Sequence, residues 1–261
     1  MTDTKASSPS STHSYLDGSV RVVETARPSE GRSTLELWMH EGPTGRWAVR
    51  TVDSRDGIVG PPSHQESNRE SDRESDRESD GEWHSPGAGV RVPTDHLAKP
   101  TADFDFLVGT WLVHNRRLRE RLTGCDTWDE FENTFEARTH LGGLVSIDEG
   151  ALPQPSPYRG MTFRTYDVAA GEWLLHWFDS RDLKMDTTPV RGRFTNGAAG
   201  RVGDFVAEDT HQGVPIVCRF RWTVLGPRSA TWEQAFSADG GREWETNWTM
   251  DFTRVNGAGR G

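Results

Sequence analysis

Asp179 and Arg181 are the residues of this sequence whose types and spacing point most directly to chemistry. Because they stand two residues apart, they share one face of a β-strand with Trp177. If that face lines a cavity, the guanidinium can bind a carboxylate or enol oxygen through two N–H groups, and the indole can stack on a flat ligand. The alternative is an ion pair that only holds the end of a strand.

Gln234 and Trp248 are expected to line the same cavity. Gln234 alternates in phase with Trp232, and Trp248 alternates in phase with Trp244. A β-bulge would exchange the two faces, and these side chains would then form cross-strand pairs on a wet surface. The predicted ligand-binding residues are Trp177, Asp179, Arg181, Gln234 and Trp248.

The other candidates by residue type are four histidines and two cysteines: His114, His140, His176, His211, Cys125 and Cys218. The histidines lack the spacings of metal motifs, and the cysteines lack a CxxC pair. The sequence also lacks a phosphate loop, a dinucleotide fingerprint and a Gly-x-Ser-x-Gly motif. We therefore expect no metal and no cofactor, and we expect Cys218 to be a core residue.

The elements that must position these residues are β-strands. From residue 104 onward, ten short segments are separated by turn signals such as Asn196-Gly197, and none has the pattern of a good helix. In the segment 215–225, apolar side chains alternate with Arg219 and Arg221, which is typical of a half-buried antiparallel strand. We predict an all-β fold in which about ten antiparallel strands close into a barrel, because closure leaves no exposed edges.

The ends of this region carry a family resemblance. Gly109-Thr110-Trp111 is similar to the Gly-x-Trp entry of the calycin superfamily, in which the Trp plugs one end of the barrel and an Arg from the last strand lies over it. Arg254 stands where that Arg is expected, so we predict that its guanidinium lies within about 6 Å of the Trp111 indole.

Three Trp-rich runs resemble DUF1579, an uncharacterised bacterial lipocalin-like family. These runs are WFDSR (177–181), WEQAFS (232–237) and WETNW (244–248). The resemblance covers most of residues 104–254. It implies a lipocalin-like barrel but no activity.

Composition divides the chain into five parts. Residues 1–17 are rich in Ser and Thr and are expected to be disordered. Residues 57–103 contain three tandem copies of Arg-Glu-Ser-Asp and are expected to be an acidic, disordered linker, because these repeats have no apolar anchor to offset the entropy of ordering. Residues 104–254, with eight of the eleven tryptophans, form the predicted barrel, and residues 255–261 a disordered tail.

Residues 18–56 are predicted to be a partial second copy of barrel strands three to five. Residues 34–56 align without a gap with residues 160–182, and the run Asp53-Ser54-Arg55-Asp56 recurs as residues 179–182. Because about 40 residues cannot close a barrel, this copy must pair with the main barrel, pair with another chain to give a homo-oligomer, or stay loosely folded.

Charge and hydropathy restrict the partners and the compartment. The net charge of −10 and the lack of a basic run disfavour nucleic acid and anionic membranes. The N-terminus has no apolar stretch typical of a signal peptide, and no run approaches the roughly 18 apolar residues of a membrane helix. We expect a cytoplasmic protein with two free thiols.

Three functions remain open. The first is binding of a small, mostly apolar or aromatic metabolite in the barrel, which requires an aromatic cavity with few titratable groups. The second is a cofactor-free cyclase, isomerase or lyase, which requires an inward Asp, Glu or His with a perturbed pKa. The third is an interaction module, which would show a filled barrel and an exposed apolar patch on the N-terminal copy.

Overall fold

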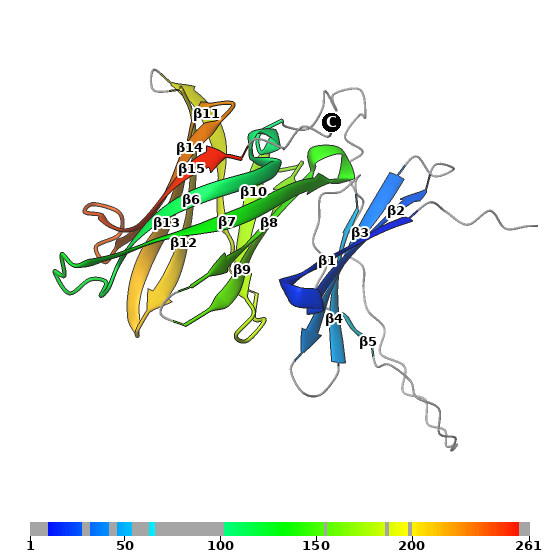
Figure 1. The fold of residues 1–261 in the computed structure, drawn as a ribbon, viewed down its shortest axis with the longest axis horizontal. Helices are drawn as coiled ribbons and strands as arrows, with labels where there is room; N and C mark the ends of the chain where they lie inside the picture. The colour runs from blue at the N-terminus through cyan, green and yellow to red at the C-terminus, as the bar shows by residue number, and fades with distance from the viewer. Residues whose placement is uncertain are drawn as a thin grey trace, which may run out of the picture.

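The computed structural model describes residues 10–27, 32–41, 46–53, 63–65, 102–153, 156–185, 188–197 and 200–255. The regular elements of these segments are β-strands and short 3-10 turns, which form a barrel and a separate sheet beside it (Figure 1). The predicted all-β class is confirmed. Within these segments, no helix has the length and apolar character needed to cross a membrane.

The barrel consists of ten antiparallel strands and is closed by pairing of β9 with β10. This confirms the predicted closed barrel. Its strands are β6 (Gly109–Leu118), β7 (Trp128–His140), β8 (Val145–Leu152), β9 (Tyr158–Asp167), β10 (Glu172–Asp179), β11 (Val190–Gly197), β12 (Gly200–His211), β13 (Val214–Gly226), β14 (Ser229–Ser237) and β15 (Glu245–Arg254).

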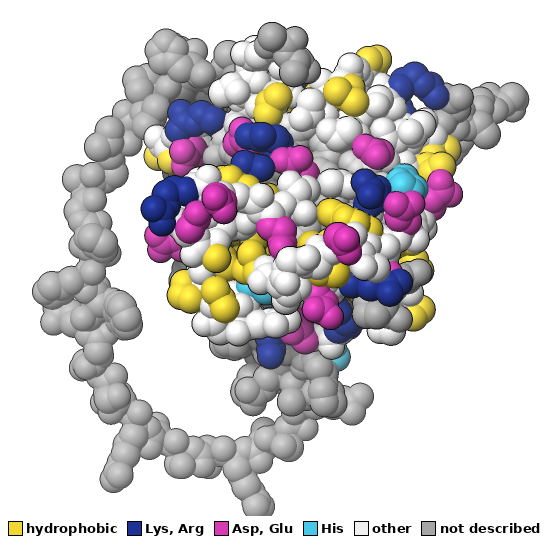
Figure 2. Space-filling view, turned by 90° about the vertical axis from the view of Figure 1, so that its left-hand side faces the viewer, with side chains coloured by type: hydrophobic (Ala, Val, Ile, Leu, Met, Phe, Trp, Pro, Cys, Tyr) yellow, Lys and Arg dark blue, Asp and Glu magenta, His cyan; other side chains and the backbone are white. Residues whose placement is uncertain are grey.

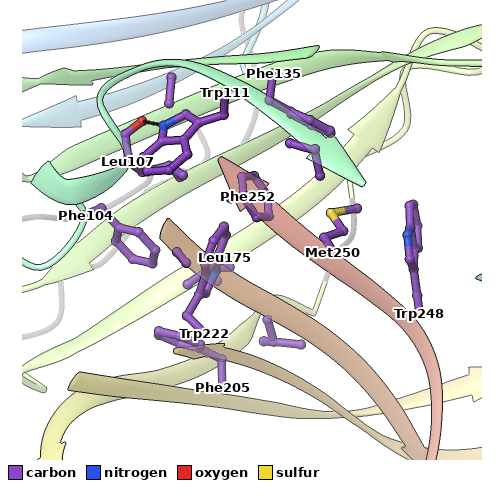
Figure 3. Packing of buried hydrophobic residues seen from close by; sticks show 14 of the residues in the cluster. Phe104, Leu107, Trp111, Phe135, Leu175, Phe205, Trp222, Trp248, Met250 and Phe252 are labelled. Atoms are coloured by element: carbon purple, nitrogen blue, oxygen red, sulfur yellow. Dashed lines mark hydrogen bonds between the residues drawn. The ribbon is translucent and has the colours of Figure 1, made fainter. Parts of the chain in front are cut away.

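The barrel interior is packed mainly with aromatic side chains. Figure 3 shows Phe104, Trp111, Trp222 and Phe252 converging from different elements toward the barrel axis. Several of these rings meet edge to face, including Phe104 and Trp222 at 6.4 Å between centroids. Such contacts are worth about 0.5–1.5 kcal/mol beyond the area buried, so they favour one arrangement of the core.

One end of the barrel is closed by Trp111 and Arg254. The Arg254 guanidinium carbon lies 4.3 Å from the centre of the Trp111 ring, so the predicted contact is confirmed. Trp111 Nε1 donates a hydrogen bond to the Leu107 carbonyl oxygen at 2.7 Å in the turn η5 (Asp105–Leu107) (Figure 3). Arg254 donates to the carbonyl oxygen of Phe106 in the same turn. Gly109 leaves the space for this guanidinium, because an added Cβ would lie 2.9 Å from Arg254 Nη1.

The outer face of the barrel carries cross-strand ion pairs. Arg221 on β13 pairs with Asp204 on β12 at 2.6 Å, and Arg219 pairs with Glu233 on β14 at 3.1 Å. Over the face shown in Figure 2, basic and acidic side chains are interspersed rather than gathered by sign. The polar side of the predicted alternation in β13 is therefore the solvent side.

The second sheet has the strand order β1-β2-β3-β4-β5 and is antiparallel throughout. Its strands are β1 (Ser10–Tyr15), β2 (Val20–Arg27), β3 (Arg32–Glu41), β4 (Arg46–Asp53) and β5 (Ser63–Gln65). We refer to it as the N-terminal sheet.

Two predicted boundaries are corrected by this sheet. Residues 10–17 were expected to be disordered, but they form β1 and the start of the turn η1 (Leu16–Gly18), because Tyr15 and Leu16 are buried against the barrel. Residues 63–65, within the predicted linker, form β5 along the free edge of β4. Most of the predicted linker and the tail from residue 256 lie outside the described residues.

The N-terminal sheet packs against its own barrel. Val20, Val22 and Leu37 are fully buried in one cluster with Ile147 of β8 and Phe163 of β9. Figure 1 shows the sheet lying beside β8 and β9. Of the three arrangements expected for the partial copy, the structure therefore has the first.

Strand pairing shows that the N-terminal sheet repeats part of the barrel. In the register of β3 with β4, Thr34 faces Asp53, and in β9 with β10 Gly160 faces Asp179. Both members of the second pair stand 126 positions after those of the first. The strands β2, β3 and β4 thus correspond to β8, β9 and β10, which are the third to fifth strands of the barrel, as the repeat in the sequence predicted.

Candidate functional site

The barrel encloses a cavity of about 120 Å³. This volume is somewhat below the roughly 150 Å³ of a cavity that holds benzene, so it matches a short chain, or one ring after a small shift of the lining. Its aromatic lining comes from five different strands: Phe135, Trp177, Phe220, Trp222, Trp232, Trp248 and Phe252.

A buried ion pair between Arg164 and Asp148 is the main polar feature of this cavity. Arg164 Nη2 donates to Asp148 Oδ2 at 2.5 Å, and only 3% and 6% of the two side chains are exposed. The residues come from neighbouring strands, since Asp148 faces Thr162 across the β8–β9 pair and Arg164 follows two residues later. Both lie on the inward side of their strands, so the pair is held within the barrel wall.

Arg164, which lines the cavity, retains unused hydrogen-bonding capacity. Its Nε and Nη1 atoms are buried and have no hydrogen-bond partner among the described residues. Its guanidinium carbon lies 4.9 Å from the centre of the Phe104 ring and 5.9 Å from that of Trp222. Because an unsatisfied buried donor costs about 1–3 kcal/mol, an acceptor that enters the cavity gains a prepared partner.

Sequence analysis missed both residues of this pair. Arg164 stands between Phe163 and Thr165 in a strand where polar residues are expected to face solvent. The internal repeat carries a signal that could have found the pair. The positions equivalent to Asp148 and Arg164 in the N-terminal copy are Val23 and Trp38, so the charges occur only in the copy that closes around a cavity.

Trp177, Gln234 and Trp248 all line the cavity, as expected. The Trp248 ring meets that of Trp232 at 5.7 Å between centroids, edge to face, and that of Trp177 at 6.3 Å. Gly160 makes room for Trp177, because an added Cβ would lie 2.2 Å from the indole ring. These side chains form one side of the cavity.

Trp248 is held in place by a residue that sequence analysis did not single out. Its Nε1 atom donates to Asn115 Oδ1 at 3.1 Å, and Asn115 is fully buried. Asn115 Nδ2 in turn donates to Asn133 Oδ1 at 2.8 Å. This chain of hydrogen bonds fixes the indole orientation toward the cavity.

Asp179 and Arg181 form the expected ion pair, but away from the cavity lining. Arg181 Nη2 donates to Asp179 Oδ2 at 2.5 Å, and this hydrogen bond raises the pKa of the guanidinium. The Arg181 side chain is 55% exposed, and its guanidinium carbon lies 4.1 Å from the centre of the Tyr158 ring. The pair therefore lies at the end of β10, where the strand meets solvent.

A second pocket adjoins the cavity and shares Trp177, Gln234 and Trp248 with it. Four arginines border it, and we call them the arginine mouth: Arg117, Arg119, Arg121 and Arg181. Burial, followed by the nearby Arg117, lowers the pKa of the Arg121 guanidinium. Asp129 and Asp179 pair with Arg119 and Arg181, but the arginines outnumber these carboxylates. The remaining excess of positive charge favours entry of a negatively charged molecule.

Trp244 does not line the cavity, which corrects the simple alternation expected for the last strand. The β14–β15 register shifts so that Gln234 faces Trp248 but Ala235 faces Thr246, leaving Asn247 as an extra residue. This bulge turns the preceding residues over, and Trp244 lies on the outer side, 4.5 Å from the Arg219 guanidinium.

The four candidate histidines do not line the cavity either. His140 contacts Glu24 of the N-terminal sheet at 3.3 Å, and His114 lies near Glu130 on the surface. His176 follows the alternation of Phe178 on the outer side of β10, as expected, and His211 packs against Phe236.

The cysteines and the metal-binding residue types form no further site within the described part of the chain. Neither Cys125 nor Cys218 is in a disulfide there, and Cys218 is buried in the barrel wall. The described residues contain no group of three or more His, Cys, Asp or Glu side chains placed to hold a metal ion.

Together, fold and site define a closed antiparallel β-barrel that encloses an aromatic cavity with one buried ion pair. Neither a family model nor a curated protein matches the chain.

Proposed function

We propose that the barrel binds a small, largely apolar or aromatic molecule and that Arg164 holds an oxygen atom of this ligand. The observation that carries the proposal is that Arg164 lines the cavity while its buried Nε and Nη1 atoms have no hydrogen-bond partner among the described residues. A carboxylate or carbonyl oxygen is the complementary acceptor. Phe220, Trp232 and Trp248 supply faces and edges for a ring.

The surroundings favour an anionic ligand over a neutral one. Asp148 already compensates part of the Arg164 charge, but the arginine mouth adds cations along the route of entry. A ligand of one aromatic ring with a carboxylate therefore matches the charge of the site, and it fits in size if it fills both the cavity and the adjoining pocket.

We also propose that the chain is a cytoplasmic, lipocalin-like protein related to DUF1579. The contact of Trp111 with Arg254 and the absence of a disulfide between Cys125 and Cys218 support this assignment.

Calorimetric titration with benzoate, phenylacetate and their uncharged amides tests the proposed function. We expect the carboxylates to bind more tightly than the amides and to change the tryptophan fluorescence, because Trp177, Trp232 and Trp248 surround the ligand. Native mass spectrometry of the purified protein checks for a retained small molecule.

A matched pair of double variants tests the role of Arg164. Arg164→Met with Asp148→Leu removes the inner pair without leaving a lone charge, and we expect binding to fall at least tenfold. Arg221→Met with Asp204→Leu removes a similar Arg–Asp pair from the outer face and should leave the affinity unchanged. Equal binding by both double variants would contradict the proposal.

A further inference from the structure

The turns η1 and η6 (Leu141–Gly143) have the same unusual backbone. Leu16 and Leu141 both adopt positive φ, at 48° and 50°. The residues before them also match, with φ and ψ of −130° and 165° at Tyr15 and −134° and 169° at His140. Each residue of the second turn stands 125 positions after its equivalent, so the repeat extends to the turn before β2 in one copy and the turn before β8 in the other.

The contacts between the two copies are reciprocal. The Leu16 backbone N–H donates to Glu149 Oε2 at 2.8 Å, and the Leu141 N–H donates to Glu24 Oε1 at 3.3 Å. Glu149 stands 125 positions after Glu24, as Leu141 does after Leu16. Each copy therefore binds the other through the same pair of groups, which is the property of a two-fold interface.

Two further contacts join a residue to its own equivalent. The Tyr15 hydroxyl lies 3.2 Å from His140 Nε2, and His13 Nδ1 lies 3.1 Å from Arg138 Nη1. Both pairs are again 125 positions apart. Equivalent residues meet only near the axis of a two-fold arrangement, so these contacts mark where the axis passes.

The apolar part of the interface is formed by the same face twice. The N-terminal sheet contributes one set of fully buried side chains, and the barrel contributes the residues equivalent to them. The equivalent pairs are Val20 and Val145, Val22 and Ile147, Leu35 and Met161, Leu37 and Phe163, and Val52 and Phe178. The outer face of β8, β9 and β10 is thus complementary to itself.

We propose that this outer face is a self-association surface that fits the same face of a second copy of this chain, and that residues 10–65 occupy it within the chain as a shortened copy of the barrel. The intact chain is therefore a monomer in which the N-terminal sheet and the barrel contact each other as two subunits of a two-fold dimer would. In a dimer, the second chain would place its own β8 to β10 on this surface in the position of the N-terminal sheet. The rest of its barrel would then point away from the interface and meet no obstacle, because the cavity face of each strand is opposite its contact face. The proposal is independent of ligand binding, which uses the inner face of the same strands.

Releasing the N-terminal sheet in the full-length chain tests this proposal. Leu37→Asp places a carboxylate at a fully buried position of the sheet, and Val214→Asp places one at an exposed position of the barrel as a control. Light scattering should give 29.2 kDa for the unmodified chain and the control, and twice that mass for Leu37→Asp. Adding Phe163→Asp, the equivalent change on the barrel, should restore the single-chain mass.

Thiol cross-linking locates the axis of the released dimer. In a Leu37→Asp, Cys125→Ser background, His140→Cys should be linked to the same residue of a second chain by a short bis-maleimide. Without Leu37→Asp the same cysteine should remain unlinked, and Thr195→Cys, an exposed residue of β11, should remain unlinked in both backgrounds.

A Leu37→Asp chain that keeps its tryptophan circular dichroism but stays at the single-chain mass would overturn the proposal. An unmodified chain that is already a dimer and is dissociated by Phe163→Asp would also overturn it. If Leu37→Asp does not fold, Glu24→Lys is judged by the same masses, because it removes the acceptor of Leu141 N–H without changing the apolar face.

Discussion

Arg164 and Arg181 each form an ion pair with an aspartate, and their surroundings give them different roles. Arg164 is enclosed by the barrel and is 3% exposed, whereas Arg181 is 55% exposed at the end of β10. A charge in the protein interior interacts far more strongly with a ligand than one that water screens. We therefore place the ligand anchor at Arg164, one strand away from the position that the sequence favoured.

Asp148→Ala should destabilise the protein by about 3–5 kcal/mol, because it leaves the Arg164 charge buried without compensation. The double change Asp148→Leu with Arg164→Met should cost much less, since it removes both charges and keeps the volume. Urea unfolding followed by tryptophan fluorescence measures both values. Equal losses in the single and double variants would show that the pair is not the source of the effect.

Arg181→Leu should reduce ligand affinity less than threefold, because this side chain lies at the mouth and outside the cavity lining. The association rate should fall and lose part of its salt dependence, since the mouth has one cation fewer. Stopped-flow fluorescence at low and high salt measures these rates. Loss of binding as large as that of the Arg164 double variant would place the anchor at the mouth instead.

At the scale of the element, the two faces of a strand explain where alternation predicts well. In β13, one side meets the core and the other meets water, so Cys218 and Trp222 alternate visibly with Arg219 and Arg221. In β9, the barrel buries one side and the N-terminal sheet buries the other, so nearly the whole strand is buried. Alternation then disappears, and with it the signal that would have placed Arg164 inside.

Gly109→Ala should lower the free energy of unfolding by about 1–3 kcal/mol. Gly109 has a φ of +110°, where side chains are strained, and its added methyl group would displace the Arg254 guanidinium from the barrel end. Gly226→Ala is the matched control, because a Cβ there meets nothing within 4 Å, and its effect should stay within about 0.5 kcal/mol. Thermal and urea unfolding of the two variants measure the two losses of free energy. Equal losses would mean that the space at Gly109 is not needed for the contact of Arg254 with Trp111.

At the scale of the whole molecule, polar contacts attach the N-terminal sheet to the barrel and make the attachment sensitive to acid. The hydrogen bond to His140 lowers the pKa of Glu24 from its ordinary 4.5, while burial, followed by the charges of His140 and Arg138, lowers the pKa of His13 from 6.5. Both groups favour the folded state in their deprotonated forms. Their contributions are complete above the ordinary pKa values and are lost as the pH falls through the lowered ones.

Stability should therefore decrease as the pH falls below about 6.5 for the part due to His13, and below about 4.5 for the part due to Glu24. Glu24→Gln should flatten the second part of this profile. Glu130→Gln, which removes an exposed carboxylate paired with Arg116, should leave the profile unchanged. Urea unfolding between pH 8 and pH 3.5 measures the three profiles, and parallel curves for all three proteins would contradict this assignment.

Local sequence patterns by themselves determined the all-β class, the closure of about ten strands and the internal repeat, and the resemblance to the calycin superfamily predicted the contact of Trp111 with Arg254. Turn signals, period-two alternation and four identical consecutive residues act over short stretches, so they can be read along the chain. Alternation also assigned Trp177, Gln234 and Trp248 to definite faces of their strands, and the structure turns these faces toward the cavity.

Only the tertiary structure decided which polar groups face the cavity and what the repeat does. Arg164 and Asp148 meet through the pairing of two strands, and the bulge at Asn247 that turns Trp244 outward depends on the register of β14 with β15. The N-terminal sheet finds its place because its apolar face matches the outer face of β8 to β10, which is a property of two surfaces rather than of either sequence. The contacts of the N-terminal sheet with the barrel join residues more than 100 positions apart. The sequence does not show them, because no local pattern encodes which distant surface a buried face will meet.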